Sequence, residues 1–272
     1  MLRNTLKYLV NNRFLSYSLF EKPFWLPRAD VQKIKELKNK YQGKRCFIIG
    51  NGPSLNDIDL SLLKDEYTFG VNSIFIKEET ENFKPNFYVV EDSHVFYDNI
   101  DKINTFDTQL KLFPTAYKKI ITNRKNTLFF NMNTGFYQHF SPYFEIPRFS
   151  PDVTDELFCG QSVTMLNLQL AYYFGFNEVY LIGMDFSYEI PKSAIIDGDT
   201  ILSTEDDPNH FDGSYFGAGK KWHDPKIHNV LKSYQLCKTM FEMDNRKIYN
   251  STLGGKLELF ERKNFSSLFD HE

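Results

Sequence analysis

The run Gly50-Asn51-Gly52-Pro53-Ser54 has the composition of a loop that binds a phosphate. It follows the apolar run Cys46-Phe-Ile-Ile, which predicts a buried strand, and precedes Leu55 to Leu63, which we expect to form a helix. Glycine permits a tight turn, proline suits a first helical turn, and the amides of a helix N-terminus attract an anion. Neither Gly-x-Gly-x-x-Gly nor Gly-Lys-Ser/Thr is present, which disfavours dinucleotide oxidoreductases and P-loop kinases. The alternative is a tight turn without a ligand.

Polar residues also follow the other predicted strands. Asn72-Ser73 follows Tyr67 to Val71, Glu91-Asp92 follows Asn86 to Val90, and Asp185-Phe186 closely follows Glu178 to Gly183. Parallel sheets place their sites at the carboxyl ends of the strands, so we expect these side chains to meet at one edge. There they can bind the base and ribose of a nucleotide, although each residue taken singly is also a common cap or loop residue.

Two histidines in the long polar segment after Asp185 are the candidates for a general base. His210 and His223 lie in an irregular segment rich in aromatic residues, and a histidine there can take a proton from a sugar hydroxyl near neutral pH. Lys220 and Lys221 are either partners of a leaving phosphate or solvated charges. Asp197-Gly-Asp199 has the Asp-x-Asp form with which many glycosyltransferases hold a metal, but the tripeptide is common in acidic loops, and we assign no metal ligand.

The elements that must position these residues alternate between strand and helix. Further strands are predicted at Thr127 to Phe130 and Lys247 to Asn250, and helices at Ser162 to Phe174 and His228 to Glu242. Short apolar strands separated by helices predict an α/β fold with a Rossmann-like, doubly wound, mostly parallel sheet. We expect one nucleotide-binding domain over residues 41–265, with a lid over about 186–226.

Residues 1–40 differ from the rest because apolar and basic residues alternate at near-helical spacing, which predicts an amphipathic segment. Residues 1–20 either rest on a membrane surface, or pack on the domain or on a second subunit of a homo-oligomer. A net charge of −3 spread along the chain disfavours nucleic acid as a partner. Three widely separated cysteines and the lack of a long apolar run predict a cytoplasmic protein, peripheral at most to the inner face of the membrane.

Three motifs together resemble a known superfamily. They are Phe47 to Leu55, Gly70-Val-Asn-Ser73, and Gly175 to Phe186, which reads Gly-Phe-Asn-Glu-Val-Tyr-Leu-Ile-Gly-Met-Asp-Phe. They are similar to the superfamily that joins bacterial sialyltransferases of the Campylobacter lipooligosaccharide type to the 6-hydroxymethylpterin diphosphokinase MptE-like domain. The resemblance covers about residues 44–260.

The resemblance implies roles for individual residues. We expect four residues to bind the CMP part of a CMP-sugar, namely Asn51, Gly52, Ser54 and Asn72. His223 is the implied base for the acceptor, and Tyr188 the implied partner of the departing phosphate. The turn Gly160-Gln-Ser162 replaces a Ser/Thr-Gly turn of the family, and it offers amides and a hydroxyl to a phosphate or carboxylate.

The expected function is that of a glycosyltransferase in the synthesis of a surface glycan such as lipopolysaccharide or capsule. Its partners are a nucleotide-sugar donor, such as CMP-linked sialic acid or a related keto-acid sugar, and a glycan acceptor, and it requires no cofactor. One alternative is pyrophosphoryl transfer from ATP to a hydroxymethylpterin, with Mg²⁺ held by Glu91, Asp92 or Asp185. The other is a non-catalytic nucleotide-binding module.

Overall fold

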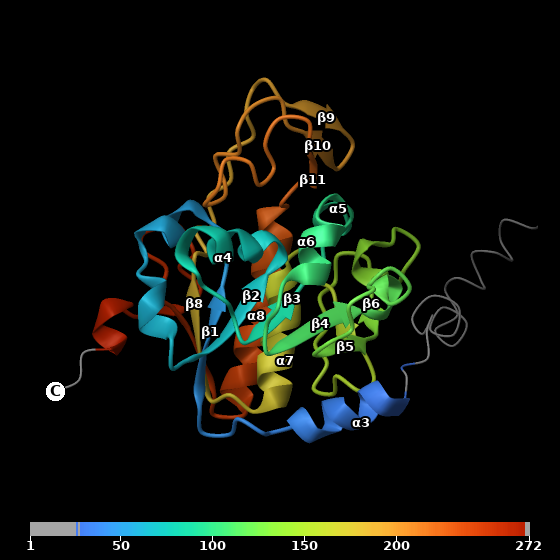
Figure 1. Ribbon diagram of the computed structural model, residues 1–272, viewed down its shortest axis with the longest axis vertical. Helices are drawn as coiled ribbons and strands as arrows, with labels where there is room; N and C mark the ends of the chain where they lie inside the picture. Colours follow the sequence, from blue (N-terminus) through green and yellow to red (C-terminus); the bar gives the residue numbers. More distant parts are fainter. Residues whose placement is uncertain (1–25, 27, 270–272) are drawn as a thin grey trace, which may run out of the picture.

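The computed structural model describes residues 26 and 28–269, so the predicted amphipathic residues 1–20 lie outside the described part. Its centre is an eight-stranded sheet with the order β13-β12-β8-β1-β2-β3-β4-β5 (Figure 1). Every neighbouring pair in this sheet is parallel. The expected α/β fold with a Rossmann-like parallel sheet is confirmed.

Strand β1 (Arg45–Ile49) shows why the strands are continuous apolar runs. Cys46 and Ile48 belong to one buried cluster, whereas Phe47 and Ile49 belong to the other. Successive side chains of a strand point to opposite faces, and both faces of this sheet are covered. A run without polar alternation is therefore what a central strand of this sheet requires.

The chain leaves β1 in one direction along the sheet and returns on its other side. It passes through β2 (Tyr67–Val71), β3 (Phe87–Val89), β4 (Leu110–Pro114) and β5 (Thr127–Phe130), and then through β8 (Glu178–Ile182), β12 (Lys247–Asn250) and β13 (Glu261–Arg262). The strand order reverses between β1 and β8, and a crevice opens at such a point beyond the carboxyl ends of the strands. Of these strands, β4 and β13 were not predicted.

The helices form one layer on each face of the sheet. On one face lie α3 (Arg28–Leu37), α7 (Val163–Phe174) and α8 (Ile227–Met243), whose apolar residues share a cluster. On the other lie α4 (Ile76–Glu81), α5 (Ser93–Asp98) and α6 (Ile100–Thr105). The predicted helix at α7 is confirmed: the Ser162 hydroxyl accepts the Thr164 amide at its start, and Gly175, at φ 91°, ends it.

The prediction of a helix over Leu55 to Leu63 is wrong. Two short 3₁₀ turns, Pro53–Asp57 and Leu60–Leu63, stand in its place. Ile58 between them is extended, and the Asp59 carboxylate caps the second turn by accepting the Ser61 amide. Side-chain hydrogen bonds of this kind compete with helix formation, which explains the break.

Helix α3 belongs to the domain core, although the predicted boundary placed it in a separate segment ending at residue 40. Its residues Ile34 and Leu37 are buried in the cluster beneath α7. The amides of Asn39 and Tyr41 donate to the carbonyls of Tyr173 and Phe174. The domain therefore begins no later than Arg28. In the described part of the chain, no helix is long and apolar enough to cross a membrane.

Two smaller sheets extend beyond the carboxyl edge of the large one. Strands β9 (Ile195–Asp197), β10 (Thr200–Leu202) and β11 (Lys221–His223) form an antiparallel sheet within the expected lid, at the top of Figure 1. Strands β6 (Met132–Asn133) and β7 (Leu157–Phe158) form a short parallel pair near β5. Together they enclose the space above the sheet edge.

Candidate functional site

A cavity of about 560 Å³ lies at the carboxyl edge of the large sheet. Its walls come from the ends of β1, β2, β3 and β8, the first residues of α7 and α8, and the lid. Of the residues predicted from the sequence, those that line it are Gly50, Asn51, Gly52, Asn72, Glu91, Asp92, Ser162, Asp185, Phe186, Tyr188, His210 and His223. The structure thus gathers most of the predicted site at one place.

The glycines of the predicted phosphate loop are required by packing against the loop after β8. A Cβ on Gly50 would lie 2.5 Å from the carbonyl oxygen of Gly183, and a Cβ on Gly52 would overlap the carboxylate of Asp185. Only residues without a side chain allow this approach. The two glycines are therefore explained by the close contact between the loop after β1 and the loop after β8. The sequence predicted contact with a ligand instead.

The amides of Gly50, Gly52 and Ser54 are hydrogen-bonded within the protein, which corrects the expectation that they hold a phosphate. Gly52 donates its amide to the Gly183 carbonyl at 2.9 Å. Ser54 donates its amide and its hydroxyl to the two oxygens of Asp185, at 3.2 and 2.8 Å. The Asp185 carboxylate thus occupies the anion position of the 3₁₀ turn. Ser54 does not line the cavity, and neither does Pro53, which begins this turn.

Asn51 and Asn72 form a polar corner with unused hydrogen-bonding capacity. The Asn51 amide nitrogen donates to the Val71 carbonyl at 3.0 Å and to the Tyr215 hydroxyl at 2.9 Å. Its oxygen and that of Asn72 are buried and have no hydrogen-bond partner among residues 26 and 28–269. Such oxygens are rare in folded proteins and accept donors such as ribose hydroxyls or an exocyclic amine. Ser73, behind this corner, is buried and lies outside the cavity wall.

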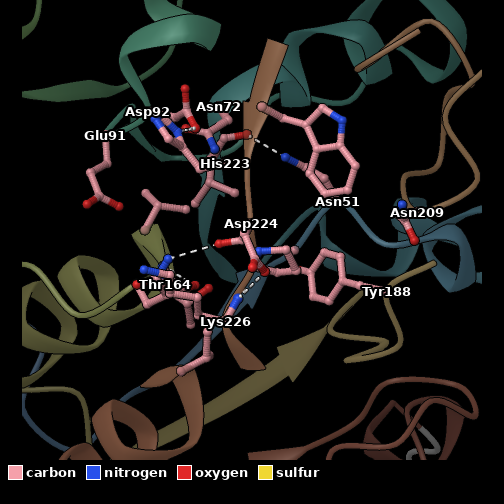
Figure 2. Close-up of a pocket in the computed structure, with 18 of the residues that line it drawn as sticks. Asn51, Asn72, Glu91, Asp92, Thr164, Tyr188, Asn209, His223, Asp224 and Lys226 are labelled. Atoms are coloured by element: carbon pink, nitrogen blue, oxygen red, sulfur yellow. Dashed lines mark hydrogen bonds and ion pairs between the residues drawn. The ribbon is translucent and has the colours of Figure 1, made fainter. Parts of the chain in front are cut away.

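His223 on β11 faces Asp92 at the end of β3. The His223 Nδ1 lies 3.6 Å from Asp92 Oδ2, and the His223 ring stacks on that of His94 at 4.7 Å. The Asp92 carboxylate also caps α5 by accepting the amides of His94 and Val95. The nearby Asp92 carboxylate raises the pKa of His223 above 6.5, although burial acts in the opposite direction. Figure 2 shows both side chains on one side of the cavity.

His210 has a tighter setting at the Asn51 end of the cavity. Its Nδ1 lies 2.6 Å from Asp207 Oδ2, and its ring stacks on Tyr215 at a centroid distance of 4.0 Å. Burial would raise the pKa of Asp207, but hydrogen bonds from His210 and from the Asn209 and Phe216 amides outweigh it and lower the pKa. This group is therefore a rigid wall of the polar corner that Asn51 and Asn72 form.

Glu91 provides a third titratable group. The Tyr137 hydroxyl donates to its carboxylate at 2.8 Å, and the Tyr117 hydroxyl donates to its carbonyl at 2.7 Å. Burial raises the pKa of Glu91 to about 7, although the Tyr137 hydrogen bond acts in the opposite direction. Near neutral pH this carboxyl is thus present in both protonation states.

Other predicted residues play distinct parts. Tyr188 lines the cavity and is 43% exposed. Ser162 also lines it, and its hydroxyl lies 3.1 Å from that of Tyr234. Gly160 lies behind the wall, where a Cβ would collide with Ser233. The turn before α7 therefore contributes Gln161 and Ser162 to the cavity, but not Gly160.

Of the two lysines and two aspartates suggested for phosphate or metal binding, Asp199 lines the cavity and the other three do not. Lys220 donates to the carbonyls of Ser214 and Tyr215, Lys221 is exposed on β11, and neither lines the cavity. Asp197 is exposed, and Asp199 is paired with Lys226 at 2.8 Å. Residues 26 and 28–269 contain no cluster of three or more His, Cys, Asp or Glu side chains that could hold a metal ion.

Backbone strain marks the cavity independently of these motifs. Four described residues that are neither glycine nor asparagine have a positive φ, and all four line the cavity. They are Glu145, Gln161, Phe186 and Lys226. Asparagine tolerates this conformation, whereas other residues pay about 1–3 kcal/mol and are retained mainly at functional sites. Glu145 and Lys226 were not predicted from the sequence because no local pattern reports φ. Asp207 was also not predicted, although the spacing to His210 was a usable signal.

Comparison with known proteins gives one assignment. A search of curated proteins finds no match to the chain. The family model described as 6-hydroxymethylpterin diphosphokinase MptE-like matches residues 26–191, more than half of the chain. This match includes the sheet from β1 to β8, with the Asn51–Asn72 corner, Glu91, Asp92 and Asp185, and it ends before His210 and His223. The chain belongs to the 6-hydroxymethylpterin diphosphokinase MptE-like family.

Proposed function

We propose that the chain is a transferase that binds a CMP-linked sugar in the cavity and transfers the sugar to a glycan acceptor. The observation that carries the proposal is the pairing of His223 with Asp92 on the wall of a cavity that also holds the unpaired oxygens of Asn51 and Asn72. A base held by a carboxylate suits proton removal from a hydroxyl. The two oxygens suit the amine and hydroxyl groups of a cytidine.

The proposed reaction is a single displacement. His223 removes the proton of an acceptor hydroxyl, and the oxygen attacks the anomeric carbon of the donor sugar. The bond from that carbon to the phosphate oxygen breaks, and CMP leaves with the electron pair. In this proposal Tyr188, which lines the cavity, donates to the departing phosphate. Attack from the face opposite CMP inverts the configuration of the sugar.

Pyrophosphoryl transfer from ATP is the second candidate, because the matched family is described by that activity. It would need carboxylates to hold Mg²⁺. The three carboxylates considered for this role are already engaged by Ser54 at Asp185, by the α5 amides and His223 at Asp92, and by Tyr137 at Glu91. This arrangement favours the CMP-sugar proposal.

A thermal-shift panel of CMP, UDP, GDP, ADP and ATP, each with and without Mg²⁺, tests the proposal. A ligand that binds only the folded state raises the melting temperature. CMP should give the largest rise, and Mg²⁺ should not change it. A larger rise with Mg²⁺-ATP would transfer the assignment to pyrophosphoryl transfer. Binding of CMP without consumption of a CMP-linked donor in the presence of acceptors would indicate a non-catalytic module.

A further inference from the structure

We propose that Lys226, at the N-terminus of α8, is the cation that binds the anionic group of the donor, and that Asp199 of the lid occupies this lysine until the donor enters. The anion is a phosphate or a carboxylate, since a CMP-linked keto-acid sugar carries both. The inference rests on the proposed function, and it adds a binding residue to the same cavity.

The position of Lys226 is the first argument. Lys226 lines the cavity, and Figure 2 shows it on the side opposite Asp92 and His223. Its ammonium lies 2.8 Å from Asp199 Oδ2 and 3.6 Å from Glu145 Oε1. A ligand that spans the cavity from the Asn72 corner would therefore bring its charged group toward this lysine.

The charge of the cavity wall is the second argument. Of the residues that line the cavity in the described part of the chain, Lys226 is the one lysine or arginine. The wall also contains six carboxylates, namely Glu91, Asp92, Glu145, Asp185, Asp199 and Asp224. An anionic donor in such surroundings needs a cation, and a lysine is a common ligand of phosphate.

The backbone around Lys226 is the third argument. Lys226 has a φ of 37°, and Gln161 before α7 has a φ of 67°. The Gln161 side chain donates to the Asp224 carbonyl at 3.1 Å, which ties the N-terminal ends of the two helices together at the cavity. Helix N-termini carry partial positive charge, so the ends of α7 and α8 add to the field of the lysine. The strained backbone holds the lysine at this junction.

The partners of Lys226 explain how its side chain is held in position while no donor is bound. Asp199 lies in the turn between β9 and β10, and its side chain is 62% exposed. The Asp199 carboxylate can leave Lys226 and become hydrated with little loss of free energy, because exposed ion pairs contribute little stability. Glu145, which is 31% exposed, keeps Lys226 directed into the junction during the exchange. Binding of the anion replaces one carboxylate partner by another anion and leaves the charge balance of the lysine unchanged.

The test measures dissociation constants of CMP and cytidine by calorimetry on the full chain at low salt. Lys226→Met should raise the dissociation constant of CMP about 10-fold and leave that of cytidine unchanged, because a charge-assisted hydrogen bond to phosphate is lost. Asp199→Asn should lower the constant of CMP about threefold because the competitor is removed. The double variant should match Lys226→Met. Lys221→Met, which changes an exposed lysine outside the cavity, is the matched control and should have no effect.

Further ligands separate the possible outcomes. A Lys226→Met effect on N-acetylneuraminate alone would assign the lysine to the carboxylate of the donor, and an effect on CMP assigns it to the phosphate. The inference is overturned if Lys226→Met changes neither ligand, or changes CMP and cytidine equally. It is also overturned if Asp199→Asn weakens CMP binding, since the pair would then only fasten the lid. If the unmodified chain binds ATP and not CMP, the proposed function fails, and the same comparison between ATP and adenosine tests the lysine. If Lys226→Met does not fold, the Asp199→Asn variant tests the inference, which requires that its dissociation constant for CMP be lower than that of the unmodified chain.

Discussion

The two stretches of the lid that carry histidines are held to the body of the protein in different ways. Around His210, Phe211 donates its amide to the Asn51 carbonyl at 2.8 Å, and Asn56 donates to the Phe211 carbonyl at 2.8 Å. Phe211 and Tyr215 are also buried in the core beneath α4 and α5. This stretch is an extension of the glycine loop and cannot open without breaking the core.

The stretch around His223 has fewer contacts with the body. Trp222 is buried in the same cluster, but its ring stacks on Phe216 and its indole N–H donates to Ser203, both within the lid. His223 is 48% exposed, and it meets the body through Asp92 at 3.6 Å and the ring of His94. Regions with few buried contacts open at low free energy, and lids that admit substrate and release product are drawn from them. Under the proposed function, we therefore expect the His210 stretch to serve recognition and the His223 stretch to serve proton transfer.

The largest expected effect is on His223. His223→Ala should lower turnover about 10²–10⁴-fold with little change in CMP affinity, because a general base acts on the acceptor proton and not on the cytidine. Release of CMP from a CMP-linked donor with an acceptor present is the assay. His228→Ala, an exposed histidine on α8 outside the cavity wall, is the control and should retain activity. A smaller loss than that of His210→Ala would reverse the assignment of the two stretches.

Loss of His210 should act on binding and stability more than on turnover. His210→Ala leaves the buried Asp207 carboxylate without its side-chain partner, which should cost about 1–3 kcal/mol of unfolding free energy. It also removes the ring stacked on Tyr215, so CMP affinity should fall. Chemical denaturation and calorimetry measure both. Adding Asp207→Asn should recover part of the stability, because a neutral amide needs no cation; unchanged stability in both variants would contradict the rigid-wall interpretation.

The partner of His223 should set the pH dependence. A general base must be unprotonated, so activity should rise with pH through the pKa of His223, which the nearby Asp92 carboxylate raises above 6.5. Asp92→Asn should move this acidic limb toward lower pH, and the α5 cap survives because asparagine also caps helices. The kcat/KM profile of the variant measures the shift. The charge of Glu91 also raises the pKa of His223, but less than Asp92 does, so Glu91→Gln should move the limb in the same direction by a smaller amount if His223 causes it.

The smallest effect concerns the stability contributed by Glu91. Its pKa is raised from 4.5 to about 7 in the folded state, so folding favours the protonated form, and stability falls as pH rises from 4.5 through 7. Glu91→Gln imitates the protonated form and can still accept from Tyr137. Its melting temperature should exceed that of the unmodified chain by about 2–4 °C at pH 8. Below pH 4.5 the two should coincide, and a constant difference across this range would exclude titration of Glu91 as the cause.

Much of the sheet was predictable, for a local reason. The strands from β1 to β3, β5 and β8 are mostly apolar runs, because both faces of the sheet are buried and nearly every position needs an apolar side chain. Strand β4 (Leu110–Pro114) contains Lys111 and ends in proline, and β13 has two residues. Neither presents the apolar run on which the prediction depended.

The sequence alone determined which polar residues stand at the carboxyl ends of the strands, because strand ends follow from hydrophobic runs and parallel strands share an edge. Only the tertiary structure decided how these residues are used. The Gly50–Ser54 loop packs against the loop after β8, because Gly183 and Asp185, far along the chain, fill the space where an anion was expected. His210 and His223 acquire different partners because Asp207 is local and Asp92 is brought by the fold. Lys226 reaches the cavity through a left-handed backbone that no local pattern encodes, since such strain is sustained by packing from the whole domain.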